Sequence, residues 1–216
     1  STMATAKRLG IPREVIVRND DGSIDVDKYD FTNALVVMNA VSNIDGRQLK
    51  NIKEVIDKVH RQGGIYIIDA AQTMSYYHDL ISGLPADAIC FSSHKMYGPS
   101  MGVIVLRRDL LDRMDIEFIG GGMVDDVTKD EFVLSAHNPE HIHTALEAGL
   151  QPYAEAIGLG AAIDWMQAVA KTEHEHVRQY SQQIIGTLRD AEGMHVLNAE
   201  PTPTIAFYSD KINGHL

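Results

Sequence analysis

The sequence predicts an α/β fold, in which a mainly parallel β-sheet has helices on both of its faces. Short apolar runs occur at 35–38, 65–68 and 88–91, and a stretch with helical periodicity separates the first two. Short continuous apolar runs are typical of strands that are buried on both faces, as in a parallel sheet. A strand–helix–strand unit implies a right-handed crossover, which makes the two strands parallel.

The segment between the first two strands is predicted to be an amphipathic helix. Its apolar residues recur at helical spacing and form one stripe, made up of Leu49, Ile52, Val55, Ile56 and Val59. Gly63 and Gly64 follow directly, and glycine favours the left-handed turn that closes a helix. The helix therefore has one face to bury against the sheet.

Further strands are expected on either side of this unit. The run at 103–106 follows the third strand after a short turn, so we expect it to run antiparallel. The β-branched run at 15–17 is expected to form a short strand. The stretch from 120 to about 147 is polar and irregular, and long loops of this kind are often functional.

The C-terminal part is predicted to begin a second, small α+β domain. A long helical region is expected at about 153–188, with a break in it, and a strand at 204–208. The expected division is a large domain at 1–172, which lacks its N-terminal part, and the start of the small domain at 173–216.

Composition and charge exclude several classes of protein. The net charge of −11 argues against a broad nucleic-acid surface and against binding to anionic membranes. No apolar run has the length of a membrane span, and the N-terminus does not resemble a secretory signal. The single cysteine, Cys90, allows no internal disulfide, which indicates a reducing, cytoplasmic location. Because Cys90 lies in an apolar run, it is expected to be a buried, inert thiol.

Polar side chains follow each of the three predicted parallel strands. Asn43 follows the first strand, Asp69 ends the second, and the block Ser92–Lys95 follows the third. In open parallel sheets, ligands bind beyond the carboxyl ends of the strands. We therefore expect these residues to converge on one crevice.

These side chains match the chemistry that pyridoxal 5′-phosphate (PLP) requires. A lysine at a strand end, here Lys95, can form a Schiff base with an aldehyde. A nearby carboxylate, here Asp69, can keep a ring nitrogen protonated. Gln72 can donate to a phenolic oxygen, and the hydroxyls and imidazole beside Lys95 can hydrogen-bond a phosphate.

Two blocks of sequence carry a family resemblance. Asp69–Gln72 (DAAQ) and Ser92–Pro99 (SSHKMYGP) resemble the signatures of PLP enzymes with the class V aminotransferase fold, and are most similar to group II cysteine desulfurases and selenocysteine lyases. Val41–Gly46 (VSNIDG) resembles a further family segment. Three more segments follow in the order of the family, namely Gly120–Met123, Glu147–Gly149 and Ala156–Ala162. The implied fold is the large domain of fold-type I PLP enzymes.

The resemblance implies a role for each candidate residue. Lys95 would carry PLP as a Schiff base and move protons, Asp69 would pair with the pyridinium nitrogen, and Gln72 would contact the phenolate oxygen. The remaining residues are implied to lie around the cofactor: Ser92 and His94 at the phosphate, and Asn43 near the cofactor and the substrate carboxylate.

The implied activity is the release of sulfur or selenium from a small amino acid, cysteine or selenocysteine, which leaves alanine. The resemblance also implies a homodimer, a sulfur-acceptor protein as partner and a role in iron–sulfur cluster assembly. Two alternatives remain open. One is another class V enzyme, such as an aminotransferase, an epimerase or a kynureninase-like lyase; the other is a non-catalytic, truncated relative.

The chain also departs from the family pattern. It begins after the family's first phosphate-binding helix and ring-stacking histidine, and it ends before the catalytic cysteine and the carboxylate-binding arginine, so we expect an internal fragment or a degenerate relative. Cys90 lies in a strand and cannot replace that cysteine. Leu150 stands where the family usually has a threonine that reaches the neighbouring subunit's phosphate.

Two histidine pairs do not predict a metal site. His141 and His143, like His174 and His176, lack carboxylate or cysteine partners at ligand spacing. The second pair is expected to lie on a solvated helix face.

Overall fold

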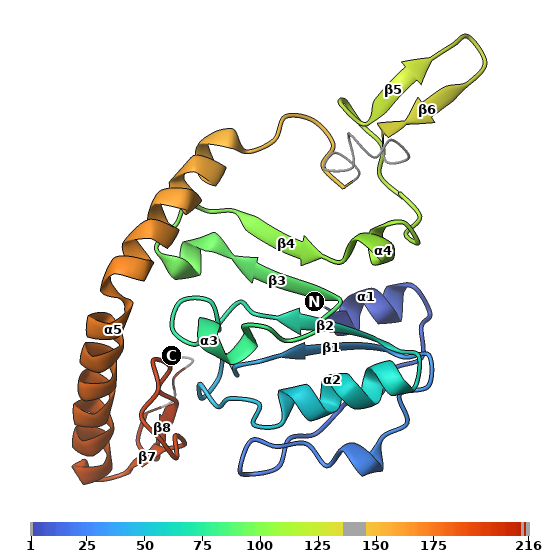
Figure 1. Ribbon diagram of the computed structural model, residues 1–216. Coiled ribbons are helices and arrows are strands. Elements are labelled where there is room, and N and C mark those ends of the chain that lie inside the picture. Colours follow the sequence, from blue (N-terminus) through green and yellow to red (C-terminus); the bar gives the residue numbers. More distant parts are fainter. Residues whose placement is uncertain (1, 136–145, 213, 215–216) are drawn as a thin grey trace.

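The computed structural model describes residues 2–135, 146–212 and 214. Its centre is a four-stranded sheet with the order β1-β2-β3-β4 (Figure 1). The strands are β1 (Leu35–Asn39), β2 (Ile65–Asp69), β3 (Ala88–Ser92) and β4 (Gly102–Leu106). The first three are parallel, and β4 runs antiparallel to β3. The predicted α/β class, the parallel unit and the reversed fourth strand are confirmed.

Helix α2 (Ile52–Arg61) packs its apolar stripe against the sheet, as predicted. All five residues of the stripe are buried, namely Leu49, Ile52, Val55, Ile56 and Val59. They meet the sheet residues Val36, Met38, Tyr66 and Ile68 in one cluster. Full burial of each aliphatic side chain contributes about 1.5–3 kcal/mol, so this cluster is the main source of stability.

The turn after α2 requires glycine at two positions. Gly63 has a φ of +73°, in the left-handed region. A Cβ on Gly64 would lie 2.8 Å from the carbonyl oxygen of Ala34. The chain can therefore pass directly from α2 into β2 only because side chains are absent here.

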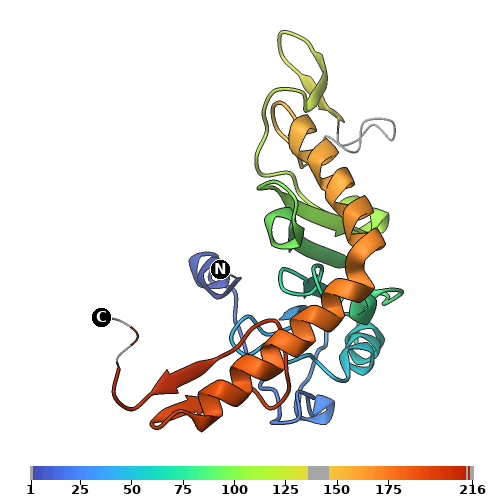
Figure 2. The same ribbon diagram turned by 90° about the vertical axis from the view of Figure 1, so that its left-hand side faces the viewer.

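The long helix α5 (Tyr153–Asp190) is continuous, so the predicted break is wrong. Its glycines do not interrupt it. One of them, Gly158, allows close packing, because a Cβ there would lie 2.9 Å from Pro99 Cγ. Figures 1 and 2 show α5 running from the region beside β4 down to the C-terminal hairpin.

The region between β4 and α5 contains more regular structure than the sequence predicts. The stretch expected to be irregular includes a two-stranded hairpin, formed by β5 (Val124–Val127) and β6 (Phe132–Leu134). Figure 1 shows this hairpin projecting away from the sheet. Residues 136–145, with His141 and His143, lie outside the described residues.

The predicted strand at 15–17 is wrong. Val15 and Val17 are exposed, and no strand is assigned to this segment. The Val17 N–H bonds to the Tyr29 hydroxyl at 2.9 Å, and not to a neighbouring strand. A β-branched run forms a strand only where a partner strand completes its ladder.

The C-terminal residues form a second hairpin, from β7 (Met194–Val196) and β8 (Phe207–Ser209). The strand expected at 204–208 therefore begins later. Thr204 and Ala206 instead bond to Asn198, which draws the chain into a turn before β8. The boundary proposed at residue 173 falls inside α5 and stays a prediction.

Short helical segments complete the molecule. They are α1 (Thr2–Arg8), η1 (Val26–Lys28), α3 (His78–Ile81), η2 (Ser93–Met96) and α4 (Arg108–Leu111). The sheet face opposite α2 is less covered, since Leu35 and Ile104 on it are both exposed. None of the described helices combines the length and apolar character needed to cross a membrane.

Candidate active site

The carboxyl ends of the three parallel strands lie side by side. Asn39 at the end of β1 is in register with Asp69 at the end of β2, and Asp69 is in register with Cys90 of β3. All three strands therefore deliver their following loops to the same edge of the sheet. This confirms the topological basis of the predicted crevice.

Asp69 occupies the central position of this edge. It is exposed, and one carboxylate oxygen accepts the N–H of Ala71 at 3.0 Å. The chain then turns tightly, because the Thr73 N–H bonds to the Ala70 carbonyl at 2.9 Å. This turn carries the half-buried Gln72. The carboxylate is thus held by its own backbone and presented at the strand end.

The loop that carries Lys95 is organised by Ser93, which is fully buried. The Ser93 hydroxyl donates to the Pro99 carbonyl, and its N–H bonds to the Met101 carbonyl at 2.8 Å. Its own carbonyl accepts the Gly98 N–H at 3.0 Å. Tyr97 adopts a φ of +65°, a conformation that costs energy for a residue with a side chain. The loop is therefore closed tightly around Ser93.

His94 and Lys95 project from this loop as exposed side chains. Among the described residues, none forms a hydrogen bond or ion pair with the Lys95 ammonium. Ser92, the last residue of β3, is half-buried below them. The amine of Lys95 is therefore free to react, while the backbone beneath it is fixed.

Helix α5 supports the Lys95 loop from one side. The rings of Tyr97 and Trp165 pack edge to face, with centroids 4.8 Å apart. Beside them, Gly158 of α5 lies against Pro99. The family-like segment Ala156–Ala162 thus serves to bring the helix close to this loop.

Asn43 lies on the β1 side of Asp69, in the loop between β1 and α2. It is exposed and lines a cavity of about 210 Å³ together with Arg18, Asn39, Ser42, Ile44, Asp45 and Arg47. Arg18 donates to the Asn39 side chain at 2.9 Å, to the Asn39 carbonyl and to the Arg47 carbonyl. Burial lowers the pKa of Arg18 from its usual value. The cavity wall therefore carries two arginines and one aspartate, and the Arg18 guanidinium is partly desolvated.

The predicted site residues lie one group after another along the carboxyl ends of β1, β2 and β3. These three groups are not in contact with one another. Because the strand order is β1-β2-β3, Asn43 and Lys95 lie on opposite sides of Asp69. The cavity beside Asn43 is lined by neither Lys95 nor Asp69.

Two groups near the site differ from expectation. Cys90 is only half-buried. The pKa of its thiol is raised mainly by burial, and further by the negative charge of Asp69. His174 is not on a solvated face, because its ring packs 4.4 Å from that of Tyr76, whereas His176 is exposed. Within the described part of the chain, no group of three or more potential ligands could hold a metal ion.

Sequence reasoning missed Arg18 and the organising role of Ser93. Arg18 follows a run that was expected to be a strand, and its partners Asn39 and Arg47 are distant in sequence. No spacing rule signals such a contact. Ser93 lies within the recognised block, so its small size and position could have indicated a buried turn residue.

Comparison with known proteins identifies a consistent set of relatives. The family model described as aminotransferase class-V matches residues 2–216. A probable cysteine desulfurase of Haemophilus influenzae is 29% identical over 94% of this chain and 47% of the relative. One of Halalkalibacterium halodurans is 31% identical over 97% of this chain and 52% of the relative.

Solved structures agree with this result. The apo structure of a cysteine desulfurase from Thermococcus onnurineus has a TM-score of 0.83 and 25% identity, and it covers 99% of this chain and 54% of that structure. The chain thus spans about half the length of the relatives that it matches.

Proposed function

Because this chain belongs to the class-V aminotransferase family, we propose that it holds PLP at the sheet edge between Lys95 and Asn43. The observation that carries this proposal is the placement of Asp69, at the end of a central parallel strand, between a free lysine and a polar, cationic cavity. The proposed PLP-binding residues all lie at the ends of three adjacent strands or in the segments that follow them, as is usual for ligand sites of open α/β sheets.

The donor set fits PLP group by group. The Lys95 amine is exposed and unpaired among the described residues, so it can react with the cofactor's aldehyde. The anchored carboxylate of Asp69 suits a protonated ring nitrogen. His94 and Ser92 offer hydrogen bonds to a phosphate on the same side as Lys95, and Gln72 offers an amide to the ring oxygen.

When bound, PLP supplies an electron sink for charge that develops on an amino-acid substrate. Asp69 would keep the ring nitrogen protonated and thereby strengthen that sink. Lys95, whose side chain is exposed, would accept and return protons at the substrate carbon. Asn43 would orient the substrate carboxylate from the opposite side.

For the whole protein, we propose the activity of a cysteine desulfurase. The curated relatives of this chain carry that name at about 30% identity over almost all of its length. The reaction would release sulfur or selenium from cysteine or selenocysteine, leave alanine, and pass the sulfur to an acceptor protein in iron–sulfur cluster assembly. With one cysteine and a net charge of −11, a cytoplasmic location is proposed.

A homodimer is part of this proposal. Leu150 is 93% exposed, and Phe118 and Ile157 are about three-quarters exposed. These large apolar side chains lie in the segments before and after the β5–β6 hairpin, and we propose that a second subunit covers them. Leu150 would then contribute apolar contact where the family's threonine contributes a hydrogen bond.

The test is site-specific labelling. The purified chain is titrated with PLP, reduced with borohydride and mapped by mass spectrometry. We expect one modified residue, Lys95, and no adduct in Lys95→Ala. Lys53→Ala is the matched control, because Lys53 is also exposed but is paired with Asp57 on α2, away from the sheet edge. Equal labelling of several surface lysines would reject the site.

A further inference from the structure

The loop that carries Asn43 is closed by its own backbone. Ser42 makes two backbone hydrogen bonds across the loop: its N–H donates to the Arg47 carbonyl at 2.9 Å, and its carbonyl accepts the Gly46 N–H at 3.0 Å. Val41 and Gln48 form an isolated bridge at its base. Asn43 itself is exposed at the tip. Any contact that fixes Asp45 or Gly46 therefore also limits the positions that Asn43 can reach.

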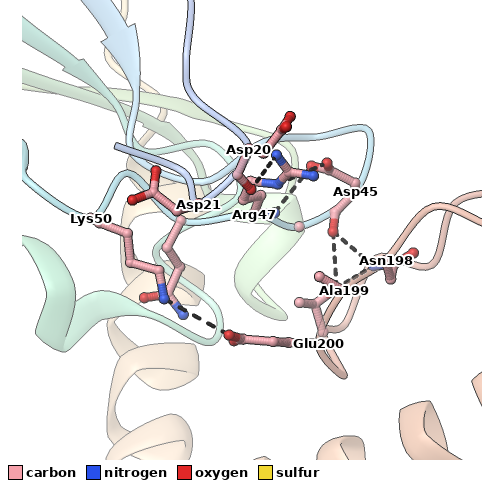
Figure 3. A pocket seen from close by; sticks show the side chains of 11 residues that line it. Asp20, Asp21, Asp45, Arg47, Lys50, Asn198, Ala199 and Glu200 are labelled. Atoms are coloured by element: carbon pink, nitrogen blue, oxygen red, sulfur yellow. Dashed lines mark hydrogen bonds and ion pairs between the residues drawn. The ribbon is translucent and has the colours of Figure 1, made fainter. Parts of the chain in front are cut away.

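Such a contact comes from the C-terminal segment, more than 150 residues away in sequence. The side chain of Asn198 is buried, and its amide donates to the Asp45 carbonyl at 2.8 Å. The same amide group donates to the Thr204 carbonyl at 2.7 Å, and its oxygen accepts the Ala206 N–H at 2.6 Å. Figure 3 shows Asn198 facing Asp45 at one end of a pocket. Every polar atom of this side chain is thus used.

Thr202 completes the contact beside Asn198. Its hydroxyl donates to the Thr204 carbonyl at 2.6 Å and lies 3.0 Å from the Asn198 amide nitrogen and 3.3 Å from the Asp45 carbonyl. Gly46 has a φ of +67°, and a Cβ there would lie 2.3 Å from the Thr202 hydroxyl oxygen. The loop and the C-terminal segment therefore approach so closely that only glycine fits at this position.

The C-terminal side of this contact is tied to α5. The Ser181 hydroxyl donates to the Thr202 carbonyl at 2.8 Å, and Arg189 donates to the Asn198 carbonyl at 2.9 Å. The opposite end of α5 packs on the Lys95 loop through Trp165. One helix thus connects the two loops that flank Asp69.

We propose that Asn198 is a positioning residue that fixes the Asn43 loop for binding of the substrate carboxylate. This inference rests on the proposed function and goes beyond it, because it assigns control of the substrate side of the site to the C-terminal segment. The physical reason is the conformational entropy that a mobile loop would lose when the substrate binds. A buried amide that is fully hydrogen-bonded holds the loop in one conformation before the substrate arrives, so less entropy is lost on binding.

The first experiment measures hydrogen exchange of the loop in the chain without cofactor. In Asn198→Ala, we expect the amides of 42–47 to exchange about tenfold faster than in the unsubstituted chain, because the loop loses the hydrogen bond that Asn198 donates to the Asp45 carbonyl. Ser135→Ala is the matched control: it removes a buried hydroxyl that donates to Asp125 at 2.8 Å, outside both the loop and the segment that holds it. Its loop amides should exchange at the original rate.

Thr202→Val provides a second, milder variant if Asn198→Ala does not fold. It preserves shape and removes only the hydroxyl, so we expect a smaller increase in exchange, about threefold, at the same amides. Unchanged exchange at 42–47 in both folded variants would overturn the proposal. Equal acceleration in Ser135→Ala would also overturn it, because the effect would then be general destabilisation.

The second experiment separates this inference from the proposed function. With the PLP-loaded chain, L-cysteine is titrated and followed by absorbance. Asn198→Ala should weaken L-cysteine binding about fivefold and leave PLP affinity within about twofold, since Lys95 and Asp69 are untouched. Equal L-cysteine affinity in the two chains would reject the positioning role. Failure of the unsubstituted chain to take PLP at Lys95 would instead reject the proposed function, while the exchange result stands alone.

Discussion

Helix α2 and helix α5 are stabilised in different ways. Of the ten residues of α2, four are buried, and all of them belong to the central core. Of the 38 residues of α5, only four are buried, in two pairs: Ala162 with Met166, and Ser181 with Ile185. Helix α2 therefore supplies the energy of the fold, whereas α5 is held by a few separate contacts.

Three contacts of α5 involve loops of the candidate site or segments bonded to them. Trp165 packs on the Lys95 loop, and His174 packs on Tyr76 in the turn beyond Gln72. Ser181 bonds to the segment that holds the Asn43 loop. The burial of α2 stabilises the fold, whereas the contacts of α5 hold the site loops in position. A substitution in one of these helices should therefore have little effect on what the other stabilises.

The largest expected effect is on α2. Ile56→Ala should lower the free energy of unfolding by about 2–5 kcal/mol, because it removes a fully buried side chain and leaves a cavity. Ile184→Ala on α5 is the matched change at a side chain that is 49% exposed, and it should alter stability by about 1 kcal/mol or less. Urea unfolding followed by circular dichroism measures both. Similar losses in the two variants would remove the distinction between the helices.

An intermediate effect is expected at the contact between α5 and the Lys95 loop. Trp165→Phe keeps an aromatic ring against Tyr97, while Trp165→Ala removes it, and the loss of such a pair costs about 0.5–1.5 kcal/mol. We expect PLP affinity to fall in the alanine variant and to be nearly retained in the phenylalanine variant. Trp165 is the only tryptophan, so its emission also reports directly on this contact.

The emission of Trp165 can be tested as a reporter of PLP binding by comparing two chains. PLP should quench the emission of the unsubstituted chain and leave that of Lys95→Ala almost unchanged. Quenching of equal size in both chains would show that PLP does not reach the loop through Lys95.

The smallest effect concerns Cys90 within the sheet. Because burial and then Asp69 raise its pKa, the thiol keeps its proton to a higher pH than an ordinary cysteine, whose pKa is about 8.5. Alkylation by iodoacetamide should be slow at pH 8.5 and should keep rising above it. Asp69→Asn should move the midpoint to lower pH, while alkylation in urea should show the ordinary value. A native midpoint equal to that in urea would contradict this prediction.

The central fold was predictable because its determinants are local. The stripe of α2 and the apolar runs of β1, β2 and β3 each express a period that can be read over a few residues. Parallel strands with loops at one edge then imply where Asp69 and Lys95 lie. The strand expected at 15–17 shows the limit, because strand formation there depends on a partner strand.

The details around the site were not predictable in the same way. The contact of Arg18 with Asn39 and that of Asn198 with Asp45 join residues that are 21 and 153 positions apart. Nothing in the local pattern marks either residue. The continuity of α5 was also misjudged, because its first half is mainly apolar and its second half mainly polar, which suggests a break that the structure does not contain.

The sequence by itself determined the α/β class, the order of the parallel unit and the polar groups at its strand ends. These follow from hydrophobic periodicity and from residue chemistry, which act over short distances along the chain. Only the tertiary structure decided which loops are fixed, which side chains remain free, and that α5 links the Lys95 side to the Asn43 side. Hydrogen bonds and close packing between distant segments arise only once the core has brought those segments together, and for that reason they leave no periodic signal.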